Sequence, residues 1–358
     1  MAKNLSLLVC HALVTLWVCC NYVGAEPEIG VYELKRGDLT VKLTNFGATL
    51  LSVVVPDKNG KLDDIALGLE TVDEYKNDYF FFGSFIGRVF NRIKGAQFTL
   101  NGVTYKLTPN IGNNTIHGGF KGLTKVIYKV KSYKQDSHIT FTYHSVDGEE
   151  GFPGDLQVSV TYSLPEPNKL EVKMKAKALN KPTPVSLGTH FYWNLGGHNS
   201  GDILSHSLQL FASRFTPLDI ELIPTGEISP VQGTVYDFLQ PHIIGSKMKE
   251  LKGGYDMNYV VDNAGDGRLA KVAVVQESKS GRKMELWSTA PGVQFYTSNV
   301  MGGVKGKGGY MYGLHAGLCL EPQGFPNSVN QPNFPSQIVN PGDIYKHVMV
   351  FEFTANSN

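Results

Sequence analysis

The sequence predicts an all-β protein, built as one large antiparallel β-sandwich. Alternation of apolar and polar residues recurs along the chain, whereas helical periodicity is scarce. The composition agrees, because 39 glycines, 17 tyrosines and 19 phenylalanines in 358 residues suit many strands and turns. No linker rich in proline or serine divides the chain after its N-terminal segment, so we expect one domain over residues 26–358.

The expected elements follow in order along the chain. Asn101-Gly102, between two alternating runs, predicts a hairpin. Thr71 and Glu74 form a Thr-x-x-Glu start, so residues 71–78 are expected to form a short helix or turn. The segments that alternate near period two are 39–47, 98–107, 138–146, 156–164, 170–179, 269–276, 283–288, 292–298 and 345–353.

The N-terminal segment has a different character. Lys3 precedes an apolar run from Leu5 to Cys20, and small residues follow at 23–25. The run is shorter than the roughly 18–20 apolar residues that span a bilayer, and His11 interrupts it. We therefore expect a cleaved signal peptide over residues 1–25, and hence a secreted protein without a membrane anchor.

The cysteines and one sequon bear on the mature protein. Three of the four cysteines lie in the N-terminal segment, so only Cys319 would remain and no internal disulfide is expected. Cys319 stands between Leu318 and Leu320, which indicates a buried thiol rather than a nucleophile. Asn113 begins the sequon Asn-Asn-Thr and is a candidate glycosylation site.

Charge and missing motifs exclude several classes of function. Lys plus Arg total 33 and Asp plus Glu total 32, so no basic or acidic balance favours nucleic acid or an anionic membrane as a partner. The chain has no dinucleotide-binding glycine motif, no phosphate-binding loop, no nucleophile elbow and no His-Glu-x-x-His pair. We therefore expect no cofactor and no metal.

Three segments place polar side chains among apolar or glycine residues. "SFIGRVFNRIKG" contains Arg88, Asn91 and Arg92, which favour either a polar ligand or structural ion pairs. His117 precedes two glycines in "NNTIHGGFKG", as in a binding loop or in a turn with an exposed histidine. His190 lies among aromatic residues in "THFYWN" and is either an acid–base group or a core histidine bonded to a carbonyl.

Three further residues complete the candidate site. Asp256 follows two glycines, and Gln294 lies in an expected strand. Glu321 ends an apolar run and precedes a loop that is rich in proline and asparagine, which we expect to hold a cleft wall. Carboxylate, amide and guanidinium groups bind sugar hydroxyls, and a Glu with a His supplies a base and an acid. We expect the apolar neighbours of Glu321 to raise the pKa of its carboxyl group.

Taken together, "GRVFNRIKG", "IHGG", "THFYWNLGG", "GGYDMNYV", "PGVQFYTSN" and "LEPQGFPNSVNQPNFP" resemble, in order, the signatures of the aldose 1-epimerases, or galactose mutarotases. The resemblance covers nearly the whole chain after residue 25, and its last signature is the most specific. It implies the galactose-mutarotase-like supersandwich, with a monosaccharide site in a cleft on one sheet. It also implies interconversion of the α and β anomers of aldohexoses such as glucose and galactose. We expect a monomer.

The resemblance also implies a role for each matching residue. Glu321 matches the catalytic base and His190 the general acid. His117 matches a second histidine near the ring oxygen. The residues that match sugar-binding groups are Asn91, Arg92, Asp256 and Gln294.

Two departures from the family pattern are expected to touch the pocket wall. His190 lies in Thr-His-Phe-Tyr-Trp-Asn, where relatives commonly have Asn-His-Ser-Tyr-Phe-Asn, and Met257 stands where a histidine is common. Two alternative functions stay open at this point. A secreted lectin on the same fold would need the binding groups without the acid–base pair, and a glycoside hydrolase would need two catalytic carboxylates, such as Asp256 and Glu321.

Overall fold

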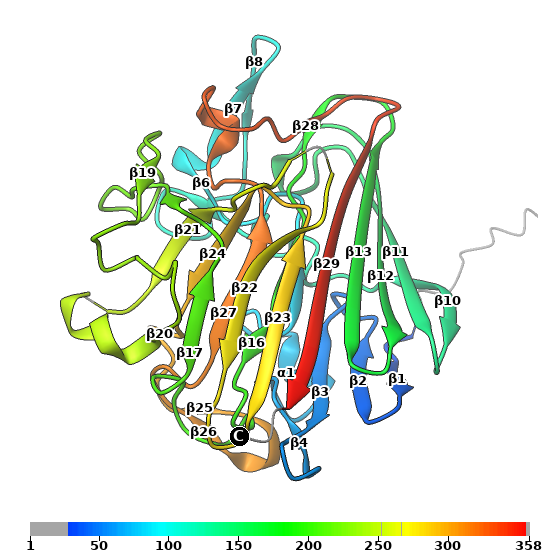
Figure 1. Cartoon of the computed structure of the whole chain (residues 1–358). Helices are drawn as coiled ribbons and strands as arrows, with labels where there is room; N and C mark the ends of the chain where they lie inside the picture. Colours follow the sequence, from blue (N-terminus) through cyan, green and yellow to red (C-terminus); the bar gives the residue numbers. More distant parts are fainter. Residues whose placement is uncertain (1–27, 252, 266, 356–358) are drawn as a thin grey trace, which may run out of the picture.

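The computed structural model describes residues 28–251, 253–265 and 267–355, which form a layered β structure (Figure 1). The predicted signal peptide over residues 1–25 lies outside the described residues. Within the described ranges, no helix combines the length and the apolar character that a bilayer crossing requires.

The largest sheet holds the most regular strands, all paired antiparallel. In β13, Leu170 and Val172 are buried while Lys173 and Lys175 are exposed, which is the period-two pattern of a sheet with one solvent face. The C-terminal strand β29 lies in the middle of this sheet, between β13 and β23 (Figure 1). The strand order is β10 (Lys129–Lys134), β11 (His138–Ser145), β12 (Leu156–Glu166), β13 (Lys169–Ala178), β29 (Ile344–Ala355), β23 (Arg282–Ser288), β22 (Ala270–Gln276), β17 (Ser207–Leu210) and β20 (His242–Ile243).

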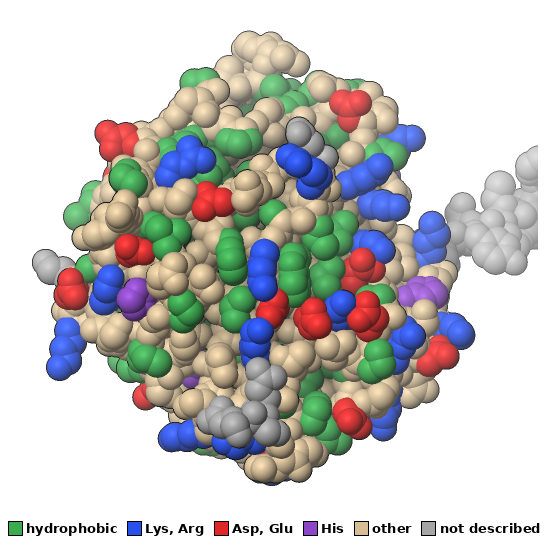
Figure 2. Space-filling model, in the orientation of Figure 1, with side chains coloured by type: hydrophobic (Ala, Val, Ile, Leu, Met, Phe, Trp, Pro, Cys, Tyr) green, Lys and Arg blue, Asp and Glu red, His purple; other side chains and the backbone are tan. Residues whose placement is uncertain are grey.

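The outer face of this sheet is charged with both signs. Figure 2 shows lysine or arginine side chains lying among aspartate or glutamate side chains across the face that the sheet presents. Lys169, for example, lies 3.0 Å from Glu166 and 3.8 Å from Glu352. Such exposed pairs contribute little to stability, so the sheet depends on the apolar residues of its inner face.

A six-stranded antiparallel sheet packs against that inner face. Leu318 and Leu320 of β27 and Phe295 of β24 share one core cluster with Leu170 and Val172 of the larger sheet. This core includes residues from Leu34 to Phe353; the prediction of one domain over 26–358 stays a prediction. The strand order is β16 (Tyr192–Trp193), β27 (Leu318–Gln323), β24 (Gly292–Tyr296), β21 (Asp256–Val260), β18 (Arg214–Phe215) and β19 (Ser229–Pro230).

Smaller elements surround the two large sheets. A four-stranded sheet is formed by β1 (Val31–Arg36), β2 (Leu39–Thr44), β3 (Leu50–Pro56) and β4 (Leu62–Asp64). The paired short strands are β5 (Ser84–Ile86) with β15 (Gly188–His190), β6 (Arg92–Ile93) with β9 (Thr115–Ile116), β7 (Gln97–Leu100) with β8 (Val103–Lys106), β14 (Thr183–Pro184) with β28 (Ile338–Val339), and β25 (Val304–Lys305) with β26 (Met311–Tyr312). The helical turns are α1 (Val72–Tyr75), η1 (Lys94–Ala96), η2 (Glu149–Gly151), η3 (Ile244–Glu250), η4 (Lys307–Gly309) and η5 (Ser328–Asn330).

The fold class and most of the expected elements are confirmed. Each of the nine alternating segments contains a strand, and β7 and β8 form the hairpin around Asn101-Gly102, where both residues have positive φ. In α1 the Glu74 carboxylate accepts a 3.0 Å hydrogen bond from the Thr71 backbone N–H, as the capping pattern predicts. The strands β1, β3 and β10 were not predicted, because their alternation is interrupted or masked by continuous apolar residues.

Candidate active site

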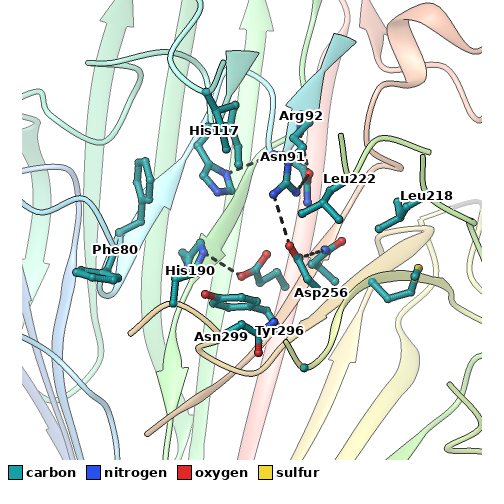
Figure 3. Close-up of a pocket in the computed structure, with 18 of the residues that line it drawn as sticks. Phe80, Asn91, Arg92, His117, His190, Leu218, Leu222, Asp256, Tyr296 and Asn299 are labelled. Atoms are coloured by element: carbon teal, nitrogen blue, oxygen red, sulfur yellow. Dashed lines mark hydrogen bonds and ion pairs between the residues drawn. The ribbon is translucent and has the colours of Figure 1, made fainter. Parts of the chain in front are cut away.

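A cleft of about 1050 Å³ opens on the face of the six-stranded sheet that points away from the core. Side chains from this sheet form its floor, and loops from other parts of the chain form its walls (Figure 3). The residues that the sequence predicts for the site and that line this cleft are Asn91, Arg92, His117, His190, Asp256, Gln294 and Glu321. The structure therefore brings all seven together from segments that are far apart in the sequence.

Antiparallel register places the floor residues side by side. Gln294 of β24 lies directly opposite Glu321 of β27. One row further along, Asp256 of β21 is opposite Tyr296, which is opposite Cys319. Because side chains alternate between the two faces of a strand, these residues share one face of the sheet, while neighbours such as Phe295 and Leu320 enter the core. Register therefore brings together the side chains that the six-stranded sheet contributes to the floor.

Glu321 is a buried carboxylate with an unused acceptor. Its side chain is 2% exposed, and its Oε1 atom has no hydrogen-bond partner in the described part of the chain. Burial raises the pKa of Glu321 well above its usual value, the nearby Asp256 charge raises it further, and Arg92 opposes both. The direction matches the sequence-based hypothesis. The assigned cause was partly wrong, because Leu318 and Leu320 point into the core on the opposite face.

His190 faces Glu321 across the cleft floor. Its Nε2 atom lies 3.2 Å from Glu321 Oε1, an ion-pair distance without the angles of a hydrogen bond (Figure 3). Its Nδ1 atom lies 3.7 Å from Cys319 Sγ. Burial lowers the pKa of His190 to about 3, so its imidazole is neutral at physiological pH. Burial thus disfavours the charged form of each member of the pair.

His117 is turned into the cleft by local backbone geometry. His117 and Asn91 both have positive φ, and their backbones pair through a 3.1 Å hydrogen bond from His117 N–H to the Asn91 carbonyl. The Asn91 backbone N–H donates to His117 Nδ1 at 3.4 Å, which leaves Nε2 to carry the ring proton. Burial, together with the charges of His190 and Arg92, lowers the pKa of His117 well below its usual value. His117 is therefore a neutral N–H donor.

Arg92 and Asp256 form the centre of a polar network. Arg92 Nη2 lies 3.5 Å from Asp256 Oδ2, and Gln294 Nε2 donates to Asp256 Oδ1 at 2.5 Å. Gln323 Nε2 in turn donates to Gln294 Oε1 at 3.3 Å, so it orients the Gln294 amide from outside the cleft. Sequence reasoning did not select Gln323, although its place two residues after Glu321 on the same strand puts it on the same face.

The loop after Glu321 holds the Arg92 segment, as its composition suggested. The backbone N–H of Asn327 donates to the Arg92 carbonyl at 2.9 Å, and the Asn327 side-chain oxygen accepts from the Lys94 N–H at 3.0 Å. One detail differs from expectation. The loop does not begin directly after Glu321, because β27 continues through Pro322 to Gln323.

Aromatic side chains complete the wall around the two histidines. The Phe81 ring centroid is 4.8 Å from His117 and 6.1 Å from His190, and Phe90 lies 5.0 Å and 6.3 Å from the same two rings. The cleft residues that sequence reasoning missed include Asp78, Phe80, Phe81, Tyr296 and Asn299. The run of three phenylalanines before Gly83 was a signal that could have found some of them.

Two expectations about neighbouring residues change with the structure. Arg88 is structural, because its buried guanidinium donates to Ser145 and to backbone carbonyls such as that of Gly154. The residues that differ from the family pattern beside His190 do not reach the cleft, since Phe191 and Trp193 pack in the core. Met257 does line the cleft, as expected.

One cluster has the side chains of a metal site. Among the described residues, ligand atoms of His190, Cys319 and Glu321 lie within 4.8 Å of one another. Metal ligation needs a thiolate and a carboxylate, but burial raises the pKa of both the Cys319 thiol and the Glu321 carboxyl group. Binding a cation here would therefore require both groups to lose a proton.

Comparison with known proteins identifies the family. Residues 30–352 match the family model described as aldose 1-epimerase. Galactose mutarotase from Sus scrofa is 41% identical over 343 residues, covering 95% of this chain and 98% of its own. Aldose 1-epimerase from Escherichia coli is 34% identical over 326 residues, covering 88% and 92%. An aldose epimerase homologue from C. elegans superimposes with a TM-score of 0.87 at 31% identity, covering 92% and 100%.

The match extends over the whole fold and includes the segments that build the cleft. A family model that spans most of the chain and full-length relatives above 30% identity lead to the same result. The chain belongs to the aldose 1-epimerase family.

Proposed function

We propose that this protein is an aldose 1-epimerase, an isomerase that interconverts the α and β anomers of free aldohexoses such as glucose and galactose. The observation that carries the proposal is the pair formed by Glu321 and His190, 3.2 Å apart on the floor of a cleft lined with hydrogen-bonding groups. The relatives named as galactose mutarotase or aldose 1-epimerase support the same reaction.

In the proposed reaction, Glu321 and His190 act in their ionised forms, after one proton has passed from the Glu321 carboxyl group to His190 Nε2 across the 3.2 Å that separates them. The carboxylate of Glu321 then takes the proton from the anomeric hydroxyl while the imidazolium of His190 gives a proton to the ring oxygen. The C1–O5 bond breaks and the open-chain aldehyde forms. Rotation about C1–C2 then presents the other face of the carbonyl to the C5 hydroxyl. In ring closure His190 accepts the proton from that hydroxyl and Glu321 returns one to the new anomeric oxygen. All atoms and electrons are conserved within the sugar and these two side chains.

The remaining polar residues would orient the sugar. Asp256 would accept hydrogen bonds from sugar hydroxyls, and Arg92 and Gln294 hold that carboxylate in place. His117 presents a neutral N–H donor near His190, suited to the ring oxygen. This network also argues against a glycosidase, because Asp256 is bound to two donors and is not a free catalytic acid.

Polarimetry tests the proposal. The protein is added to freshly dissolved α-D-galactose and α-D-glucose, and the approach to the equilibrium rotation is timed; the same protein is titrated with sugar by calorimetry and assayed on a chromogenic glycoside. We expect accelerated mutarotation and no release of the chromophore. Binding without acceleration would make the protein a lectin, and chromophore release would make it a hydrolase; either result would overturn the epimerase proposal.

We further propose that the protein is secreted through a signal peptide over residues 1–25. Lys3, the apolar run from Leu5 to Cys20 and the small residues at 23–25 support this. Expression in a eukaryotic secretory host should give medium protein that begins at Glu26. Cell-retained protein with an intact N-terminus would contradict the proposal. A mass shift on deglycosylation of the same sample tests Asn113, which is exposed on the loop before His117, and light scattering tests the expected monomer.

A further inference from the structure

The segment between α1 and β5 forms the cleft wall that faces both histidines. Its Phe81 ring contacts His117 edge to face, with centroids 4.8 Å apart, and stacks toward His190 at 6.1 Å. The segment is also bonded to the strand that carries His190, because the Gly83 N–H donates to the His190 carbonyl at 3.1 Å. A shift of this wall would therefore reach the acid–base pair directly.

Phe81 holds a backbone conformation that needs support. Its φ is +58°, in the left-handed region that a bulky residue rarely adopts. Such a conformation persists only where surrounding contacts fix it, and it is concentrated at functional sites. The contacts on either side of Phe81 therefore decide whether its ring stays against the histidines.

The support comes from one buried carboxylate. Asp78 is 8% exposed, and its Oδ1 atom accepts a 2.7 Å hydrogen bond from the Phe80 N–H. Its Oδ2 atom accepts a 2.6 Å bond from the Phe82 N–H. The two bonds fix the backbone immediately before and immediately after Phe81. A third contact, from the Tyr192 hydroxyl to the Phe80 carbonyl at 2.9 Å, ties the same turn to the cleft floor.

We propose that Asp78 is a positioning residue of the sugar site, whose carboxylate clamps the Phe80 and Phe82 amides and so holds Phe81 against His117 and His190. The residue does not take part in the chemistry; it acts through Phe81. This role deepens the proposed epimerase function and rests on it. The carboxylate must be ionised to accept both bonds, since a protonated or amide group at this position loses one of its two acceptors.

The charge state of Asp78 supports a pH test. Burial raises the pKa of Asp78 to about 6, against the backbone hydrogen bonds from Phe80 and Phe82 and the positive charge of Lys125. Lys125, Tyr75 and Tyr192 are the titratable side chains that interact with it electrostatically. The clamp should therefore be complete at pH 7.5 and mostly released at pH 5.

The experiment compares Asp78→Asn with Asp73→Asn by polarimetry on α-D-galactose. Asp73 undergoes the same chemical change nearby, but its side chain is 83% exposed, pairs with Lys76 and lies outside the cleft. At pH 7.5 we expect kcat/KM to fall about tenfold in Asp78→Asn, because small misplacements at an active site have effects of this size or more. Asp73→Asn should match the wild type. The ratio of wild type to Asp78→Asn should approach one at pH 5, where the wild-type clamp is itself protonated.

A double variant shows whether Asp78 acts through Phe81. If it does, Asp78→Asn combined with Phe81→Ala should be no slower than Phe81→Ala alone. Three results would each overturn the proposal: losses of kcat/KM that add in the double variant, a wild-type kcat/KM in Asp78→Asn, or a ratio of wild type to Asp78→Asn that does not change with pH. Should Asp78→Asn fail to fold, the pH profile of Phe81→Ala tests the proposal instead. The wild type should lose kcat/KM as pH falls through about 6, and Phe81→Ala should not show this loss. A Phe81→Ala profile that keeps the loss near pH 6 would refute the clamp.

A readout without catalysis separates this proposal from the proposed function. Ring-proton resonances of His117 and His190 sense the ring current of Phe81, so Asp78→Asn should shift them and Asp73→Asn should not. Unshifted resonances overturn the positioning role whatever the protein does to sugars. A wild type that fails to speed mutarotation while these shifts occur would instead refute the epimerase function alone.

Discussion

Strands β13 and β27 belong to the two packed sheets, yet they use alternation for different purposes. In β13 the residues alternate between the core and solvent, so lysines occupy the outer face. In β27 all six residues are buried, because one face enters the core and the other forms the floor of the cleft. The first pattern makes a stable surface, and the second places Cys319, Glu321 and Gln323 in a buried layer with polar neighbours.

The difference teaches that a buried polar residue must be judged by its partners. His347 of β29 is a core histidine: its Nδ1 and Nε2 atoms both lie 2.9 Å from partners, the Leu187 carbonyl and the Ser288 hydroxyl. Burial lowers the pKa of His347 to about 4 and that of His190 to about 3. Low pKa values therefore do not separate the two. Their surroundings do, because His190 faces the Glu321 carboxyl group, whose Oε1 atom has no hydrogen-bond partner in the described part of the chain, whereas both ring nitrogens of His347 have one.

Replacing the carboxylate of Glu321, on the six-stranded sheet, should have the largest effect. Glu321→Gln removes the base while keeping the side-chain shape, so we expect kcat for mutarotation to fall about 10³-fold. The matched variant, Glu352→Gln, changes a residue of β29 in the nine-stranded sheet and should keep wild-type kcat. Polarimetry on both proteins measures the contrast. Equal rates in the two variants would remove Glu321 from the mechanism.

Truncating an inward side chain of the regular sheet should give the next largest effect, on stability rather than activity. Leu170→Ala leaves a cavity in the core beneath β13 and should lower the free energy of unfolding by about 3 kcal/mol. Lys175→Ala, on the exposed face of the same strand, should change it by less than about 0.5 kcal/mol. Urea unfolding of both variants checks this. A similar loss at Lys175 would mean that the charged outer face matters more than its exposure indicates.

A smaller effect is expected from replacing Asp256, the other carboxylate that the six-stranded sheet contributes to the cleft. Asp256→Asn weakens the contact with Arg92 and should raise KM about tenfold. A tenfold change corresponds to about 1.4 kcal/mol, close to the contribution of one charged hydrogen bond. Its control is Asp262→Asn, just beyond the same strand, where the carboxylate bonds Ser213 and does not line the cleft. Initial rates over a range of galactose concentrations give KM for both. A change confined to kcat would assign Asp256 to the chemistry instead.

The smallest predicted effect is a pH-dependent gain in stability. The pKa of Glu321 is raised by folding, so the unfolded chain loses this proton first as pH rises, and ionisation of Glu321 destabilises the folded state. Glu321→Gln removes that penalty. The difference in Tm, variant minus wild type, should therefore be near zero below about pH 4 and positive at pH 8. Calorimetry at the two pH values tests the sign, and a variant that is less stable at pH 8 would contradict it.

The same contrast explains what the sequence could predict. Strands with one solvent face, such as β12 and β13, follow the period-two rule, so their alternation was sufficient. Resemblance to the family found the residues that line the cleft floor. The Asp78 clamp, the left-handed Phe81 and the support from Gln323 escaped, because each depends on a tertiary contact or a backbone angle that no local pattern records. For the same reason, Phe191 and Trp193 were wrongly expected to touch the pocket wall, whereas both side chains pack in the core.

The position of β29 has a consequence for how the protein is made. This strand, Ile344–Ala355, pairs with β13 on one side and β23 on the other, so it joins the two halves of the nine-stranded sheet. It is the last of the described strands in chain order, and so the last of them to be synthesised. Until then the halves have no shared backbone hydrogen bonds at this seam, and the sheet stays open along two edges. The nine-stranded sheet can therefore close only after residues 344–355 have been synthesised, and a chain that stops before Ile344 would keep two open, aggregation-prone strand edges.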